Sequence, residues 1–533
     1  MNRVAASSSS PLRHRARAAL PTLALILAGC GLTRPPAQVQ APVPPAWQAA
    51  LPEAAATLPH AGSRAELAQW WRGAGDPLLA ELIEAAQAAS PSLASAAARI
   101  AEARAARVQA GAALLPTLDG SLSASRGNSL GASGGGLGTG TGAAAGTGGT
   151  AAGGAGTALP ALTTLQAGLQ AGWEIDLFGG LRANRDAAAA RLDASQAQWH
   201  EARVSVAAET ANAYFAERAC TRQLAVAESD TASRRESARL TQLSADAGFT
   251  APADAALARA GAADAAARLT QQRTQCALLR QSLVALTGMD AGTLGTRLAA
   301  APVQLALPAL HPVDSVPARV LAQRPDVFAA EQAVAAASGE VGAAQAQRYP
   351  RLTLSGNIGR LQLRSGDFRQ TLDTWSVGPV SLTVPIFDGG TRRANAEAAQ
   401  ARYEEAASQY RAKVRQAVRE VEEALLKLQD TDARAGDADT AVAGYDAALR
   451  AAQSRYDSGL ASQFELEDAR RTLFAAQTAR VALQRERAEA WVLLYRALGG
   501  GWQRADGQAL AAAAAPSPAS LTPSNPPAPA ARP

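Results

Sequence analysis

Gly179-Gly180-Leu181-Arg182 returns 210 residues later as Gly389-Gly390-Thr391-Arg392 in this chain of 533 residues. A second landmark, Ala247-Gly248-Phe249, returns 211 residues later as Ser458-Gly459-Leu460. A constant period of this size predicts two copies of one structural unit. A third landmark breaks the period by about 24 residues, because a glycine-rich insert (residues 131–156) lengthens only the first copy.

Strands are predicted wherever apolar residues occupy every second position. Two such runs are Leu165, Ala167, Leu169, Ala171, Trp173 and Ile175, and Val380, Leu382, Val384 and Ile386. Partner strands are predicted at residues 117–125 and 352–363, each of which follows a proline. About ten residues is the length of a strand that crosses a bilayer in a barrel.

Long helices are predicted after each pair of strands. No proline occurs between Thr391 and Tyr456, and a continuous helix over that stretch would be roughly 100 Å long. Apolar residues there alternate at spacings of four and three, the pattern of a coiled-coil seam. The seam positions are Tyr403, Ala407, Tyr410, Val414, Ala417, Val421, Ala424 and Leu428.

Two repeats supply only four strands, which is fewer than the roughly eight of the smallest membrane barrel. An open sheet edge in lipid would leave backbone groups unpaired, at several kcal/mol each. The sequence therefore predicts a homo-oligomer. It contains no apolar run of 18 or more residues after the N-terminal region, so no transmembrane helix is expected.

The first 29 residues resemble a lipoprotein signal peptide. Arginines precede a short apolar run that ends in Leu27-Ala28-Gly29-Cys30. Small residues before a cysteine predict cleavage and lipidation at Cys30, with acyl chains such as palmitate. The alternative is an ordinary signal peptide followed by an incidental cysteine.

Composition and motifs argue against catalysis. The four histidines are scattered, so neither a metal site nor another cofactor site is predicted. No nucleophile, phosphate-loop or dinucleotide motif is convincing. Part of the net charge of +5 belongs to the N-terminal segment, and elsewhere arginines alternate with acids along the predicted helices, so no nucleic-acid partner is expected.

Cys220 and Cys276 each lie 28 residues from Gly248, so an antiparallel hairpin that turns at Gly248 would place them at the same height. In an oxidising compartment this predicts a disulfide. Two buried free thiols are the alternative.

Six short motifs occur in order between residues 65 and 502. They are Trp70-Trp71, Gly75-Asp76-Pro77-Leu78-Leu79, Ser90-Pro91-Ser92-Leu93, Gln323-Arg324-Pro325-Asp326-Val327, Ala330-Glu331 and Tyr456-Asp457-Ser458-Gly459-Leu460-Ala461-Ser462. As a set, they resemble the TolC/OprM-type outer-membrane efflux proteins. The residues before Cys30 resemble a lipobox, the signal for lipidation, which places the chain nearest the lipidated, NodT-like branch.

The resemblance implies a mixed α+β membrane fold and a homotrimer. Three chains would form one 12-stranded β-barrel, continued by an α-helical coiled-coil tunnel in the periplasm. The predicted segments are a signal peptide (1–29), a lipidated Pro/Ala-rich linker (30–64), two repeats (65–300 and 301–505) and a disordered tail (506–533).

The resemblance also assigns roles to residues near the two helical turns. Ala247-Gly248-Phe249 and Ser458-Gly459-Leu460 match the tips where a periplasmic adaptor, or membrane fusion protein, docks. Glu465 and Asp468 match acids that constrict the closed tunnel, and Asp254 and Tyr456 match a pair that tethers neighbouring helices. The family's arginine after the second turn is replaced by Ala461. The alternatives are glycines that only end helices and acids on a solvated helix face.

The function implied is a passive duct in the outer membrane for small-molecule export. An inner-membrane pump of the resistance-nodulation-division type would drive it. One alternative is the outer-membrane duct of a type I protein secretion system. An alternative of another class is a periplasm-spanning scaffold that conducts nothing, and the amphipathic strands speak against it.

Lipidation at Cys30 is testable by mass spectrometry of the mature N-terminus. We expect an acylated N-terminal cysteine. An unmodified Cys30, or cleavage at another position, would contradict the lipoprotein prediction. As a control, Cys30→Ser behind a normal signal peptide should reduce anchoring more than conduction, because the lipid is separate from the duct.

Overall fold

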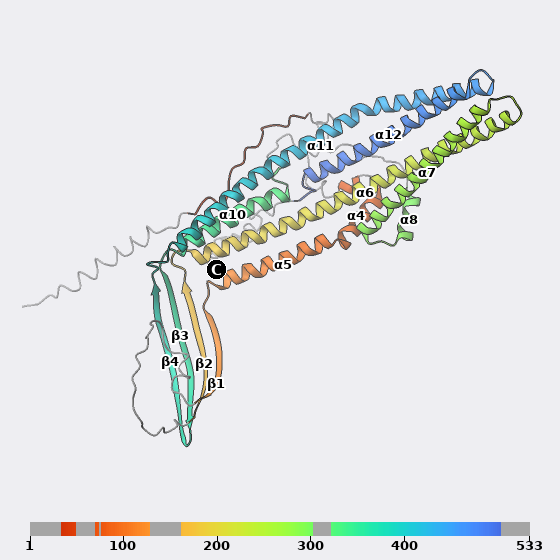
Figure 1. The fold of residues 1–533 in the computed structure, drawn as a ribbon. Helices are drawn as coiled ribbons and strands as arrows, with labels where there is room; N and C mark the ends of the chain where they lie inside the picture. Colours follow the sequence, from red (N-terminus) through yellow and green to blue (C-terminus); the bar gives the residue numbers. More distant parts are fainter. Residues whose placement is uncertain (1–33, 50–69, 74–75, 128–160, 302–320, 503–533) are drawn as a thin grey trace, which may run out of the picture. The chain divides into compact units, whose positions relative to one another are not determined.

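The computed structural model describes residues 34–49, 70–73, 76–127, 161–301 and 321–502 (Figure 1). The predicted signal peptide, Cys30, the glycine-rich insert and the tail after residue 506 lie outside the described residues. The elements in chain order are α3 (Trp70–Gly73), α4 (Pro77–Ala89), α5 (Pro91–Ala112), β1 (Thr117–Gly127), β2 (Leu162–Ile175), α6 (Gly180–Asp246), α7 (Pro252–Thr287), α8 (Ala291–Ala300), α10 (Pro325–Ala346), β3 (Arg351–Ser365), β4 (Phe368–Thr383), α11 (Thr391–Asp457) and α12 (Gln463–Ala497).

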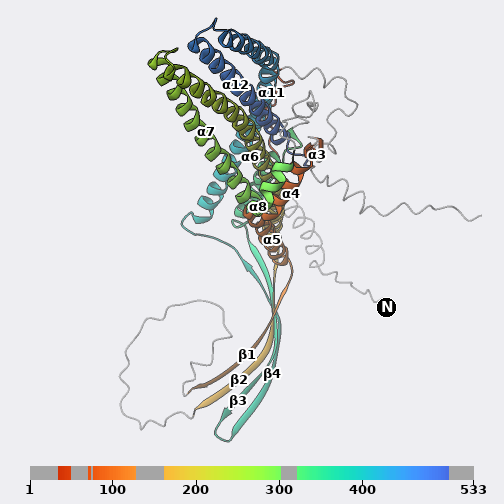
Figure 2. The ribbon, with the colours of Figure 1, turned by 90° about the vertical axis from the view of Figure 1, so that its right-hand side faces the viewer.

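The four strands form one antiparallel sheet in the order β1-β2-β3-β4, and they lie side by side in Figure 2. Three of the predicted strands are confirmed within a few residues. The fourth differs: β4 begins at Phe368 and ends at Thr383, so Val384 and Ile386 lie beyond it. Pro385 has no backbone N–H to donate to a ladder, which explains why the alternation outlasts the strand.

Residues directly opposite each other in the ladder share a face of the sheet. In the part of the sheet next to the helices, one face is apolar and the other is polar. The apolar face carries Leu118, Leu122, Leu165, Leu169, Trp173, Leu354, Ile358, Trp375, Val377, Val380 and Leu382. The polar face carries Thr117, Asp119, Ser121, Ser123, Gln166, Gln170, Ser355, Asn357, Thr374 and Ser376. Near the β3–β4 turn the pattern of these two strands reverses, because Leu361, Leu363, Phe368 and Leu372 lie on this face and Arg360, Gln362, Thr371 and Asp373 lie on the other. Most of the large apolar side chains are exposed in the single chain, so this face is not covered by the chain's own core.

A register shift keeps the apolar face continuous. Leu354 pairs with Val380 and Gly356 pairs with Val377, so β4 has one extra residue at this point. The extra residue switches the apolar positions of β4 from odd to even numbers. The residues of β4 before the shift therefore do not follow the even-numbered alternation of apolar residues from which the later half of the strand was predicted.

The long helices have the predicted extents. Both α6 and α11 contain 67 residues, and the helices that follow them contain 36 (α7) and 35 (α12) residues. The seam predicted along α11 is confirmed: Tyr410 is half-buried, and every other seam position is less than 9% exposed. Among the described helices, none combines the length and the apolar character that a membrane span requires.

The chain divides into two compact units that do not follow the boundary between the predicted repeats. We call them the sheet unit (residues 1–40, 98–195 and 330–410) and the helical unit (residues 41–97, 196–329 and 411–533). Each unit draws segments from both halves of the sequence.

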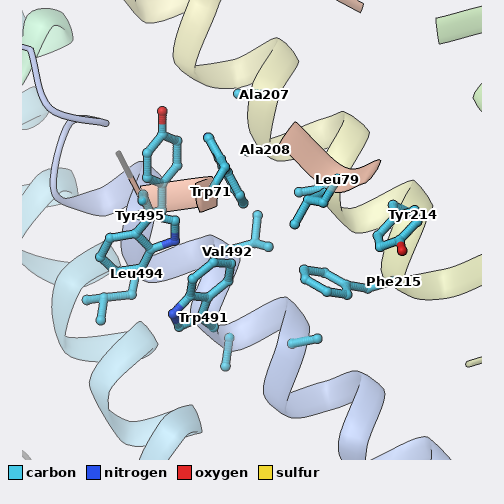
Figure 3. Packing of buried hydrophobic residues seen from close by; sticks show 14 of the residues in the cluster. Trp71, Leu79, Ala207, Ala208, Tyr214, Phe215, Trp491, Val492, Leu494 and Tyr495 are labelled. Carbon is cyan, nitrogen blue, oxygen red and sulfur yellow. The ribbon is translucent and has the colours of Figure 1, made fainter. Parts of the chain in front are cut away.

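The core of the helical unit contains a group of packed aromatic side chains, among which Figure 3 labels Trp71, Trp491, Tyr495, Tyr214 and Phe215. Trp70 stacks on Trp491 with ring centroids 4.9 Å apart, and Trp71 contacts Tyr495 at 4.5 Å. Such aromatic pairs stabilise a core by about 0.5–1.5 kcal/mol beyond the area that they bury. The Trp70-Trp71 motif therefore joins the short helix α3 to the end of α12.

Part of the predicted N-terminal linker, residues 34–49, packs against helices. In the sheet unit, Ser338 Oγ donates to the Pro35 carbonyl at 2.5 Å and the Tyr403 hydroxyl donates to the Pro36 carbonyl at 2.9 Å. In the helical unit, the Glu422 carboxylate accepts the N–H groups of Gln48 and Ala49, at 2.7 and 2.9 Å. These backbone contacts fix the path of this segment.

A buried cluster of charges holds the start of α10. The Arg324 side chain, 4% exposed, donates to Asp326 at 2.7 and 3.0 Å, to Glu420 at 2.6 Å and to the Ala497 carbonyl at 3.0 Å. Lys413 lies 3.3 Å from Asp326. Burial alone would raise the pKa of Asp326, but the bonds and charges of Arg324 and Lys413 together lower it below its usual value.

Asp326→Asn should destabilise the protein by about 3 kcal/mol. The substitution removes one of the two carboxylates that balance the buried positive charge of Arg324. The pKa of Asp326 is lower in the folded state, so the stability from this pair is present above the unfolded value near 4 and is lost as pH falls through the folded value. Urea unfolding followed by circular dichroism should therefore show a difference between wild type and variant that shrinks below about pH 4.

The control for Asp326→Asn is Asp432→Asn. Asp432 pairs with Arg487 at 3.0 Å, but its side chain is 64% exposed. Its loss should cost at most about 1 kcal/mol, because exposed pairs contribute little. Equal costs for the two variants would mean that the buried cluster does not hold the start of α10.

Candidate functional site

The turn between α6 and α7 is a Schellman motif. Phe249 N–H donates to the Ser244 carbonyl at 2.9 Å, and Gly248 N–H donates to the Ala245 carbonyl at 3.0 Å. Gly248 has φ of +80°, a conformation that an L side chain rarely adopts. Pro252 then occupies the first turn of α7, where its missing N–H costs nothing.

The turn between α11 and α12 repeats this geometry. Leu460 N–H donates to the Arg455 carbonyl at 2.8 Å, and Gly459 N–H donates to the Tyr456 carbonyl at 2.9 Å. Gly459 has φ of +74°. Ser462 caps α12 by accepting the Glu465 N–H at 3.2 Å. The two tripeptides that sequence analysis paired thus have the same hydrogen-bond pattern.

Both turns present large apolar side chains to solvent. Phe249 is 88% exposed, Leu460 is 72% exposed, and Phe464 in the first turn of α12 is 68% exposed. A rigid turn that displays aromatic and aliphatic side chains can serve as a protein-docking surface.

Glu465 and Asp468, the acids predicted to constrict the closed tunnel, each have a basic partner in the same chain. Glu465 forms an ion pair with Arg455, which also donates to the Leu460 carbonyl at 3.3 Å. Asp468 pairs with Arg471 one helical turn further on. All four of these side chains are more than 40% exposed, so the pairs hold the acids weakly and leave them accessible.

Asp254 and Tyr456, the predicted tethering pair, lie on two different helices. Asp254 lies in the first turn of α7, and Tyr456 lies near the end of α11. Among the described residues, no hydrogen bond joins Asp254 and Tyr456. In the last turn of α11, Arg455 makes a side-chain contact with α12, through Glu465.

A buried brace beside these acids was missed by sequence reasoning. Arg470, 9% exposed, donates to Glu467 at 2.9 Å and to Gln453 of α11 at 2.9 Å. Glu467 also accepts from Arg234 of α6 at 2.6 Å, and Arg234 pairs with Asp230 at 3.0 Å. The brace links α6, α11 and α12. Its local signal was only the spacing of three or four residues between acid and base.

The family profile described as "Outer membrane efflux protein" matches residues 82–289 and 316–500. The chain belongs to the outer membrane efflux protein family. The efflux protein is 32% identical over 482 residues to the pyoverdine export outer membrane protein OpmQ of Pseudomonas putida, in a match that covers 90% of this chain and 96% of the relative. It is 30% identical to the toluene efflux pump outer membrane protein TtgI, also of Pseudomonas putida, over 63% of this chain and 71% of the relative.

A solved structure of the outer-membrane channel OprN resembles the efflux protein with a TM-score of 0.71 and 28% identity. The match covers 89% of this chain and 100% of OprN. In family and fold, the chain is therefore an outer-membrane component of efflux systems.

Cys220 of α6 and Cys276 of α7 form a disulfide in the structure of the efflux protein, with Cα atoms 5.5 Å apart. Both side chains are buried. The pairing is the one that the equal spacing from Gly248 predicts, and its oxidation in the cell stays a prediction.

Peptide mapping under non-reducing conditions should recover Cys220 and Cys276 in one linked fragment. Replacement of both by serine should lower stability by about 3–4 kcal/mol, because the bridge restricts the unfolded chain. Cys30→Ser serves as the control and should leave the linked fragment unchanged. Alkylation of both thiols in native protein would refute the disulfide.

Proposed function

We propose that three copies of this efflux protein assemble into one passive duct through the outer membrane. A periplasmic adaptor and an inner-membrane pump of the resistance-nodulation-division type would complete the conduit and drive export. The observation that carries this proposal is a four-stranded sheet that has one apolar and one polar face in the part next to the helices. Such a sheet suits a wall between lipid and an aqueous lumen.

The edges of the sheet support the trimer. In the part of the chain that the structure describes, β1 pairs only with β2 and β4 pairs only with β3. Backbone groups at a free edge are costly in lipid, and pairing β4 of one copy with β1 of the next would satisfy them. Three copies would give a closed 12-stranded barrel that is wide enough for an aqueous lumen.

The two turns support docking of the adaptor. The exposed side chains of Phe249, Leu460 and Phe464 offer an apolar contact, and the glycines let a partner approach the backbone closely. The corresponding lengths of α6 and α11, and of α7 and α12, support the interpretation of two structural repeats. Lipidation at Cys30 would add an anchor to the outer membrane.

Small molecules are the proposed cargo. The relatives OpmQ and TtgI are described as exporting pyoverdine and toluene, which favours small-molecule efflux over a protein secretion system. The exposed acids Glu465 and Asp468 would form the periplasmic constriction as a threefold ring. Asp254 and Tyr456 would contact each other only between neighbouring helices of the assembled trimer.

Single-channel recording in planar bilayers tests this function. The wild-type trimer should conduct and favour cations, because an acidic ring attracts them. Glu465→Ala combined with Asp468→Ala should lower the ratio of cation to anion permeability by about twofold or more, with trimers intact. Asp264→Ala is the matched control, since Asp264 is an exposed acid on α7 with its own arginine partner.

Two outcomes would contradict the proposal in different ways. Trimers that conduct with unchanged selectivity in the double variant would show that these acids do not line the constriction. A wild-type protein that forms no conducting trimer would remove the duct itself.

A further inference from the structure

We propose that the hairpin end of the sheet's apolar face binds the phosphate groups of an outer-leaflet lipid through Arg126, Arg364 and Arg369. This inference rests on the proposed function, which puts the sheet in the outer membrane with its apolar face toward lipid. The hairpin end is the end where Gly366 and Asp367 connect β3 to β4. The opposite end leads into α6 and α11.

The three arginines lie in one row across all four strands. Arg126 of β1 pairs with Thr163 of β2, Thr163 pairs with Arg364 of β3, and Arg364 pairs with Arg369 of β4. Counting along each strand by twos puts this row on the apolar face, with Leu122, Leu165 and Ile358. All three arginine side chains are exposed.

The row has too few acids to balance it. Like charges directly opposite in a ladder repel, and Arg364 faces Arg369. Arg364 donates to Gln362 at 2.9 Å, and within the described residues no ion pair involves Arg126, Arg364 or Arg369. Two rows nearer the helices, Arg360 and Asp373 neutralise each other at 2.6 Å, and Asp119 lies on the polar face.

The neighbouring connections supply only one acid against the three arginines. Asp367 in the hairpin turn is the one acid among the residues that join β3 to β4. Residues 128–160, which join β1 to β2, contain neither an acidic nor a basic residue. An external anion is therefore the partner that fits the row.

The position of the row matches the headgroup level of a bilayer. Leu352 begins this face of β3, and Arg364 lies 12 residues further along. The apolar residues of the face extend to Ile358 on β3 and, on β2, to Leu165, which pairs with Gln362 one row before Arg364. At 3.3 Å per residue this is about 40 Å of strand, or about 30 Å along the membrane normal for a tilt near 40°. The hydrocarbon layer is about 25–30 Å thick, so the guanidinium groups would lie just outside it.

The chemistry favours a phosphorylated lipid over a free ion. One guanidinium group can bind two oxygens of the same phosphate through two parallel hydrogen bonds. Because neighbouring strands are about 4.8 Å apart, the row extends over about 14 Å, which suits a headgroup with more than one phosphate. The acyl chains of the same molecule would extend past the Arg360–Asp373 pair to Ile358, Trp375 and Val377, which are exposed on the same face. Inorganic phosphate would leave those side chains uncovered.

Binding of diphosphoryl lipid A to the purified full-length trimer in detergent tests the inference, with dephosphorylated lipid A and inorganic phosphate as comparison probes. We expect wild type to bind diphosphoryl lipid A at least about tenfold more tightly than the dephosphorylated form, because the guanidinium contacts require the phosphates. Arg126→Gln, Arg364→Gln and Arg369→Gln together should abolish that preference. Arg348→Gln, an exposed arginine before β3 at the other end of the sheet, should keep it.

Each contrary result has a distinct meaning. Equal binding of the two lipids by wild type, or an unchanged preference in the triple variant, would overturn the inference. Full competition by millimolar inorganic phosphate would indicate a free-ion site and would also overturn the lipid assignment. Channel recording of the same samples separates these failures from a failure of the duct, because a triple variant that conducts as a trimer leaves the proposed function intact.

Discussion

Unpaired backbone groups along β1 and β4 are the constraint on which the rest of the molecule depends. Within one described chain the sheet has two free edges, and its large apolar side chains have no core to cover them. A sheet of this kind is unstable in water and prone to edge-to-edge pairing. The proposed assembly answers both problems, because other copies would pair the two edges and a lipid surrounding would cover the apolar side chains.

Sequence reasoning succeeded where the signal is local and periodic. Alternation identified β2 and the later half of β4, and the heptads identified the buried stripe of α11. It missed residues 368–379 because the register shift between Leu354 and Gly356 reverses the phase of β4, and because Gly378-Pro379 resembles a strand breaker. A phase change of one residue depends on the partner strand, and a single run of sequence does not contain that information.

The candidate site was predictable only in part, for a similar reason. The glycines of the two turns were found because the tripeptides that contain them recur 211 residues apart and match the helical turns of the family. The partners of the acids were not, since Arg455 reaches Glu465 across a turn and Arg470 meets Gln453 and Glu467 on different helices. The sequence analysis recognised Arg324-Pro325-Asp326 as a motif of the family. Its place in the buried cluster of charges at the start of α10 could not be predicted, because it depends on the positions of Glu420 and Lys413.

The bond between Cys220 and Cys276 has a consequence for the survival of the exposed turn. The two cysteines are 56 residues apart, and the whole turn around Gly248 lies inside the loop that they close. A protease that nicks the chain at this accessible loop would produce two fragments that stay covalently joined. The parts of α6 and α7 between the disulfide and the turn could then keep their packing after cleavage. The two fragments would separate, for example in gel electrophoresis, only after the disulfide is reduced.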